Sequence, residues 1–147
     1  MIRAAGKDDA ARLAEIEIFN YRLNFYPIFR SDEFYFGELQ VPDRMAEYEK
    51  DGMTGHTWVY DDGVVKGFCV AQDGLLRKLF VEPVLQGQGI GAALLKYAVQ
   101  ELGVTRLWAL EKNTRAIRFY ERHGFHMTGL KKLEEGTAEY LVQMEKA

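Results

Sequence analysis

Three glycines stand at alternate positions, Gly87, Gly89 and Gly91, in the stretch "FVEPVLQGQGIGAALL" that begins at Phe80. Glycine loses more conformational entropy on folding than any other residue, so this spacing needs a physical reason. One reason is a backbone whose successive N–H groups converge on an anion, with the positive end of a following helix dipole adding to the field. Phosphate is the ligand that this arrangement favours. The alternative is a flexible connection to a glycine-rich helix start, with no ligand.

Two known phosphate motifs fit this stretch less well. A P-loop ends in Gly-Lys-Ser/Thr, whereas neither lysine nor hydroxyl follows Gly91, which disfavours nucleotide hydrolysis. A dinucleotide fingerprint is closer, because Gly87, Gly89 and Ala92 satisfy GxGxxG/A and Glu111 stands where a ribose-binding acid is expected. Against that motif, several residues separate the preceding strand from the first glycine, and that strand is the third of a hairpin meander rather than the first of a βαβ series.

A second set of polar groups lies in "NTRAIRFYERHGF". Asn113 and Tyr120 are seven residues apart, so on a helix they lie two turns apart on one face and can point at the same place. Asn113 also suits a helix N-cap, a role compatible with ligand contact. Tyr120 could instead be a core tyrosine whose hydroxyl reaches the surface.

Hydrophobic periodicity and turn residues predict the elements that must position these groups. "HTWVYDDGVVKGFCVAQDGLLRKLFV" holds three strands separated by Asp62-Gly63 and Asp73-Gly74, dipeptides that suit tight hairpin turns. The other expected elements are a strand over 2–5, helices over 8–23, 42–50, 91–102 and 114–123, a strand in "TRLWAL", and two final strands around Glu135-Gly136.

The order of these elements predicts the fold class. A strand, the glycine loop, a helix and a strand form a right-handed crossover, so the strands that end at Val81 and Leu110 should lie parallel. The expected class is therefore α/β (α+β): a mixed, mainly antiparallel twisted sheet with helices on both faces, in a single domain over residues 1–147.

Composition excludes several classes of function. With 147 residues, of which 48% are hydrophobic, the chain can build one real core. Its net charge of −3 gives no general positive field, so we expect no nucleic-acid and no membrane partner. The single cysteine, Cys69, excludes an internal disulfide, and no His/Cys/Asp/Glu cluster has the spacing of metal ligands. With no signal peptide and no long apolar run, we expect a cytoplasmic protein. The sequence leaves a homodimer open.

The segments "LFVEPVLQGQGIGAALL" and "LWALEKNTRAIRFYERHGF" together resemble the two signature segments of the GNAT superfamily of N-acetyltransferases, specifically over residues 75–125. The resemblance implies acetyl-CoA as cosubstrate and transfer of its acetyl group to a primary amine of a small molecule or peptide, by direct attack on the thioester and without a metal. It also implies that the central parallel strands separate, so that an internal strand edge can pair with the cofactor.

The resemblance further implies a role for each matching residue. Tyr120 would be the catalytic residue that meets the departing sulfur, and Asn113 would contact the cofactor. Because a thiol has a pKa near 8.5 and a tyrosine near 10, full proton transfer from Tyr120 is uphill by about 2 kcal/mol, which favours a hydrogen bond. The backbone would bind the pantetheine arm through Leu79, Phe80 and Val81 and the pyrophosphate through Gln86, Gly87, Gln88, Gly89, Ile90, Gly91 and Ala92.

The acceptor and the general base stay open. Glu111, His56 or a water chain could take the proton of the amine. Eight aromatic residues fall between Phe19 and Phe36, either as a wall or lid over an acceptor pocket or as a satellite core with a solvated acidic rim. In the first case the carboxylates nearby could attract a cationic acceptor; they are Asp32, Glu33 and Glu38.

Two further questions concern the function itself. A non-catalytic CoA-binding or regulatory module of the same fold is the alternative to the enzyme. The sequence also does not distinguish acetyl-CoA from a longer acyl-CoA.

Overall fold

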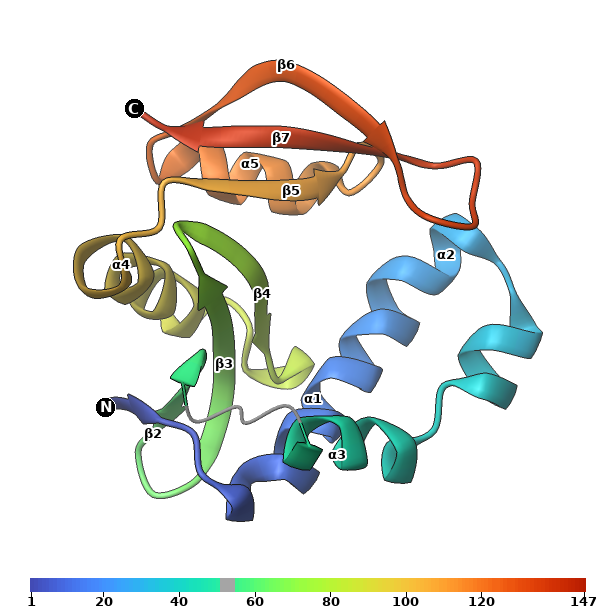
Figure 1. Ribbon diagram of the computed structural model, residues 1–147, viewed down its shortest axis with the longest axis vertical. Coiled ribbons are helices and arrows are strands. Elements are labelled where there is room, and N and C mark those ends of the chain that lie inside the picture. Colours follow the sequence, from blue (N-terminus) through green and yellow to red (C-terminus); the bar gives the residue numbers. More distant parts are fainter. Residues whose placement is uncertain (51–54) are drawn as a thin grey trace.

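A twisted sheet of seven strands in the order β1-β2-β3-β4-β5-β7-β6 forms the centre of the molecule (Figure 1). The computed structural model describes residues 1–50 and 55–147. Neighbouring strands are antiparallel except β4 and β5, which are parallel as the crossover predicts. The strands are β1 (Ile2–Ala4), β2 (Thr57–Asp61), β3 (Val65–Gln72), β4 (Leu75–Val81), β5 (Arg106–Leu110), β6 (Phe125–Leu133) and β7 (Tyr140–Lys146).

Helical segments connect and cover the strands, close to the ranges that the sequence predicts. Two short 3-10 turns, η1 (Lys7–Asp9) and η5 (Pro83–Leu85), and two π-helical turns, η2 (Tyr21–Phe25) and η3 (Glu33–Glu38), flank the longer helices. The α-helices are α1 (Ala10–Asn20), α2 (Tyr26–Phe29), α3 (Val41–Lys50), α4 (Ile90–Leu102) and α5 (Thr114–Arg122).

Strand β3 shows that helices cover both faces of the sheet. Side chains alternate between the two faces of a strand. Phe68 packs in a buried cluster with Leu13 and Ile16 of α1, whereas Cys69 packs in another with Leu94 of α4. Each of these side chains is almost fully buried, and burying an aliphatic or aromatic side chain of this size contributes about 1.5 to 3 kcal/mol. The predicted mixed α/β class is confirmed.

The parallel strands β4 and β5 form a fork. They pair only at Leu75 with Arg106 and at Leu76 with Leu107. Beyond this point all of β5 pairs with β7, while β4 bends away, a divergence that Figure 1 shows clearly. The expected separation of the strands that end at Val81 and Leu110 is therefore present.

The first long helix continues beyond its predicted end. The sequence predicts a helix over 8–23, but helical backbone runs through η2 and α2 to Phe29. Pro27 does not break it, because it lies in the first turn of α2, where a missing N–H costs little. The N–H of Tyr26 donates to Tyr21 across the π turn, and Arg30 ends α2 in a left-handed conformation.

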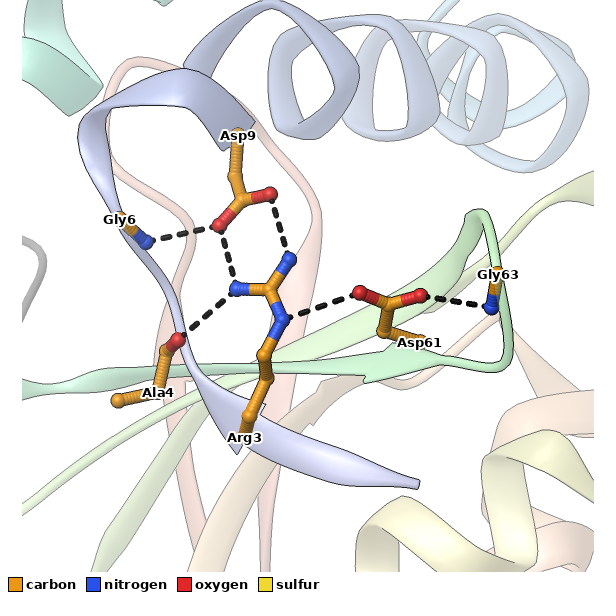
Figure 2. A network of polar contacts seen from close by, with 6 residues as sticks. All are labelled: Arg3, Ala4, Gly6, Asp9, Asp61 and Gly63. Carbon is orange, nitrogen blue, oxygen red and sulfur yellow. Dashed lines mark hydrogen bonds and ion pairs between the residues drawn. The ribbon is translucent and has the colours of Figure 1, made fainter.

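A charged network holds the N-terminal strand against the hairpin of β2 and the start of α1 (Figure 2). The Arg3 guanidinium donates to both carboxylate oxygens of Asp9, at 2.9 and 3.0 Å, and through Nε to Asp61 at 3.0 Å. The same carboxylates accept from the backbone N–H groups of Gly6 and Gly63. Hydrogen bonding from Arg3 is the main cause that lowers the pKa of Asp9.

In the parts of the chain that the structure describes, we find no helix with the length and apolar character that crossing a membrane requires.

Candidate functional site

A cavity of about 1150 Å³ runs through the fork between β4 and β5. The glycine loop and α5 line it on one side of the sheet, and the aromatic segment after α1 lines it on the other. It brings together Tyr120 and all the residues that the sequence predicts to bind the cofactor except Gln88, which is exposed and does not line it. The predicted residues that do are Leu79, Phe80, Val81, Gln86, Gly87, Gly89, Ile90, Gly91, Ala92, Asn113 and Tyr120.

The glycine loop has the geometry of an anion cradle. Gly87 and Gly89 adopt φ of +86° and +84°, a region that other residues rarely enter. A Cβ at either position would have no heavy atom within 4 Å, so the space beside the loop is open. No side chain caps α4 at Gly89, and Ala93 donates to the Gly89 carbonyl at 3.0 Å. The N–H groups of the first turn before Ala93 therefore lack intrahelical acceptors and suit a phosphate.

Gly91 differs from the other two glycines. It lies inside α4, and a Cβ there would be 3.6 Å from Phe119 and from Val81, which is ordinary van der Waals contact. The packing around α4 therefore does not require glycine at this position, and only the N–H of Gly91 bears on the cradle.

The backbone of β4 offers hydrogen-bonding groups to the fork at alternate residues. Glu82 donates to Lys66 O on β3 at 2.9 Å, so the backbone groups of Phe80 also face β3. Those of Leu79 and Val81 face the fork. Of the three residues predicted to pair with a pantetheine arm, only Leu79 and Val81 can therefore offer backbone groups to it. Phe80 can contribute only its side chain.

Asn20 is a site residue that the sequence reasoning missed. It is 3% exposed, and its Nδ2 donates to Ile16 O and Val81 O, both at 2.9 Å. Its Oδ1 accepts from Gln86 Nε2 at 3.1 Å. Asn20 therefore ties α1 both to the end of β4 and to the start of the glycine loop. In the sequence, Asn20 could have been noticed because it is a polar amide at a position of the helical pattern where a buried residue is expected.

Helix α5 presents Asn113 and Tyr120 to the cavity. Asn113 caps the helix, since its Oδ1 accepts from Ala116 N at 3.3 Å, and its amide N–H groups are left for a ligand. The Tyr120 ring packs edge-on against Phe119 and Phe125. Burial, with a smaller effect of the Cys69 thiol, raises the pKa of Tyr120 far above its ordinary value. The hydroxyl therefore stays protonated and can act as a hydrogen-bond donor.

Cations from α5 add positive charge to the same wall. Arg115 and Arg122 line the cavity. The chain as a whole is negatively charged, so these side chains provide the local attraction that an anionic ligand needs.

The aromatic segment is both a small core and a wall of the cavity. Tyr35 is buried in a cluster with Ile18 and Leu39, and Phe25 and Phe29 pack against it. Several of its rings also line the cavity; they are Tyr21, Phe25, Phe29, Phe34 and Tyr35. The acidic residues of this segment, Asp32, Glu33 and Glu38, are exposed and are absent from the described lining of the cavity.

Neither predicted base lines the main cavity. Glu111 is half exposed and pairs with Lys131 at 2.9 Å. His56 lines a second cavity of about 780 Å³ on the α3 side of the sheet. The acidic residues that do line the main cavity in the described chain lie in the β6–β7 loop and are Glu134, Glu135 and Glu139.

A sheet that opens around a cavity, beside the uncapped N-terminus of a helix, is an arrangement that suits an extended anionic molecule. A family model described as an acetyltransferase (GNAT) domain matches residues 53–127, just over half of the chain. The chain belongs to this family.

Individual relatives agree with this assignment. The peptidyl-lysine N-acetyltransferase YiaC from Escherichia coli K12 is 39% identical over 72 residues, which cover 48% of this chain and 49% of YiaC. The chain spans about half the length of the curated relatives it matches. The solution structure of apo YjaB from Escherichia coli superposes with a TM-score of 0.81 at 20% identity, covering 100% of this chain and 97% of YjaB. The structure of yncA from Salmonella typhimurium with its cofactor acetyl-CoA gives 0.65 at 26% identity, covering 98% and 91%.

Proposed function

We propose that residues 1–147 form a single N-acetyltransferase domain that transfers the acetyl group of acetyl-CoA to a primary amine. The observation that carries this proposal is the fork between β4 and β5 with the glycine cradle at its open end, because together they fit an extended thioester cofactor with a pyrophosphate. The acetyl-CoA complex of the yncA structure supports the choice of cofactor.

In this proposal the chain's own groups bind the cofactor at three places. The N–H groups from Gly87 to Ala92 hold the pyrophosphate, and charge-assisted bonds of this kind contribute about 1.5 to 3 kcal/mol each. The backbone of Leu79 and Val81 pairs with the pantetheine arm, and the Asn113 amide donates to it. These contacts place the thioester beyond Leu79, toward the base of the fork.

The transfer itself is a direct aminolysis. The neutral amine attacks the thioester carbonyl carbon, the C–S bond breaks and the CoA thiolate leaves, while the amine nitrogen releases a proton to water as the amide forms. Tyr120 donates a hydrogen bond to the sulfur as negative charge develops on it. No step requires a metal, because the attacking amine and the thioester are already reactive partners.

Titration calorimetry with acetyl-CoA, followed by a thiol-release assay over a panel of primary amines, tests the function. We expect binding, and CoA release that depends on the amine. Binding without amine-dependent release would instead support the non-catalytic CoA-binding module, and no binding would contradict both. The same assay with longer acyl-CoA thioesters identifies the preferred acyl group.

A pair of glycine variants tests where the cofactor binds. Gly89 and Gly103 lie at opposite ends of α4, and both have positive φ. A Cβ added at either position would have no heavy atom within 4 Å. Replacing either by alanine should cost a similar amount of stability, roughly 1 kcal/mol, from backbone strain. Only Gly89→Ala should weaken acetyl-CoA binding, by about tenfold or more, because its methyl group enters the cradle. Equal affinities of the two variants would refute the cradle.

A further inference from the structure

One carboxylate occupies the place where the two cavities meet. Four residues line both the main cavity and the second one, and they are Arg77, Lys78, Trp108 and Glu134. Arg77 and Trp108 directly follow the last paired residues of β4 and β5, so this junction lies at the base of the fork. Glu134 is the carboxylate among the four.

A closed turn holds Glu134 in this place. Its N–H donates to Glu139 O at 2.8 Å, and its carbonyl accepts from the backbone N–H and the hydroxyl of Thr137, at 3.0 and 2.9 Å. The Thr137 hydroxyl also accepts from Glu139 N at 3.1 Å. The backbone of Glu134 is therefore fixed at both its N–H and its carbonyl, so the carboxylate is presented from a rigid position rather than from a loose loop.

Glu134 and the aromatic wall line the same cavity. Figure 1 shows the β6–β7 loop next to α2, and residues of both segments line this cavity. Burial is the main cause that raises the pKa of Tyr35, and the charge of Glu134 raises it further. The pKa of Tyr21 is raised by burial first and also by Glu17 and Glu134. Glu134, Tyr21 and Tyr35 all line the main cavity, so the carboxylate and both tyrosines border the same space.

The other carboxylates near the site are already engaged. Glu17 is fully buried and pairs with Lys78 Nζ at 2.6 Å, which neutralises that cation at the junction. Glu139 pairs with Lys112 at 2.9 Å, and Glu111 pairs with Lys131 outside the cavity. Glu135 is exposed at the cavity rim. Within residues 1–50 and 55–147, Glu134 is half-buried at the junction and forms no ion pair.

We propose that Glu134 binds the ammonium group of the acceptor at the base of the fork, with the acceptor's alkyl stem lying along the rings of Tyr21, Phe34 and Tyr35. The inference rests on the proposed function, because the base of the fork is where the thioester is expected. A half-buried carboxylate beside aromatic faces selects an alkylammonium, since the rings favour a cation and its apolar stem over a neutral polar group or an anion. Glu134 is therefore a specificity-determining residue, and the acceptor class is a primary alkylamine such as a lysine side chain.

Calorimetric titration of the CoA-saturated protein with Nα-acetyl-lysine amide tests this proposal without requiring turnover. We expect Glu134→Gln to weaken binding of this amine by tenfold or more while its affinity for CoA stays at the wild-type value. Glu135→Gln is the matched control, because it makes the same charge change one residue away, at the exposed rim, and should bind the amine like wild type. Thermal unfolding of each variant verifies that the fold is kept.

Each other outcome counts against the proposal. If wild type does not bind the amine, or if Glu134→Gln binds it equally well, Glu134 is not the acceptor carboxylate. An equal loss in Glu135→Gln would indicate a general field of the loop and would also overturn it. A failure of the proposed function is seen separately, as the absence of CoA binding or of amine-dependent CoA release. With any amine that is turned over, Glu134→Gln should raise the acceptor KM more than it lowers kcat, a split that a purely structural role would not produce.

Discussion

At the scale of single residues, Tyr120 is the residue whose proposed chemical role can be tested most directly. Its pKa is raised by burial, so it releases a proton less readily than an ordinary tyrosine, and a full transfer to a thiolate is more unfavourable than the sequence alone indicates. The group that the site holds is a neutral hydroxyl. In the proposed reaction it can therefore donate a hydrogen bond to the sulfur at any pH below this raised pKa.

Replacing Tyr120 by phenylalanine should lower kcat by roughly 10²-fold or more and leave the KM for acetyl-CoA nearly unchanged, because the hydrogen bond forms mainly in the transition state. Steady-state kinetics on a confirmed acceptor measure this. Tyr97→Phe, on α4 and outside the described cavity lining, is the matched control and should behave as wild type. If chemistry limits turnover and Tyr120→Phe keeps the wild-type kcat, Tyr120 only packs against its neighbours.

At the scale of elements, the alternation of β4 gives a residue-by-residue prediction. Adding acetyl-CoA should slow amide hydrogen exchange, followed by NMR, at Leu79 and Val81, whose N–H groups face the fork. Phe80 faces β3 and serves as the internal control, with no change on binding. Protection confined to the glycine loop, or equal protection of all three amides, would contradict the pairing of the cofactor with β4.

Sequence reasoning predicted what depends on local pattern. The hairpins at Asp62-Gly63 and Asp73-Gly74, the cap at Asn113 and the glycine loop follow from short-range conformational preferences, and the structure contains all of them. Asn20 was not predicted as a site residue because its partners Val81 and Gln86 are 61 and 66 residues away in the sequence. Such contacts exist only after the chain has folded, and no local pattern encodes them.

The same limit explains why the sequence suggested carboxylates that do not line the cavity. Asp32, Glu33 and Glu38 were candidates because they stand next to aromatic residues in the sequence. In the fold these three carboxylates are exposed and do not line the cavity, although Phe34 and Tyr35 beside them do. Glu134, about a hundred residues further along the chain, lines the same cavity from the β6–β7 turn. Closeness in sequence was a poor guide because this part of the cavity is assembled from two distant segments.

At the scale of the whole molecule, the buried acidic groups determine stability at high pH. Burial raises the pKa of the Cys69 thiol to about 12, and it also raises those of Tyr48 and Tyr120. Above about pH 9 the unfolded chain releases protons that the folded chain keeps, so the free energy of unfolding falls as pH rises. Each such group contributes a slope of about 1.4 kcal/mol per pH unit between its unfolded and folded pKa.

Replacing Cys69 by alanine should make the free energy of unfolding fall less steeply as pH rises. Between pH 9 and 10 an unfolded cysteine is mostly ionised whereas an unfolded tyrosine is at most half ionised, so Cys69 is expected to be the largest single contributor to the loss, beside smaller contributions from the buried tyrosines. Urea unfolding at pH 7, 9 and 10 measures it. The variant is less stable at pH 7 because it leaves a small cavity, but its stability should fall less steeply above pH 9. Parallel pH dependences in the two proteins would show that Cys69 does not titrate in this way.

The fork between β4 and β5 also bears on how the protein avoids aggregation. A free strand edge is a template for any extended polypeptide. This edge opens into a cavity with Tyr120 on one face of the sheet and Trp108 on the other. A polypeptide strand would project side chains to both faces, where these rings stand, whereas a diamide arm carries none. We therefore expect the position of this edge inside the sheet to limit its pairing with other chains.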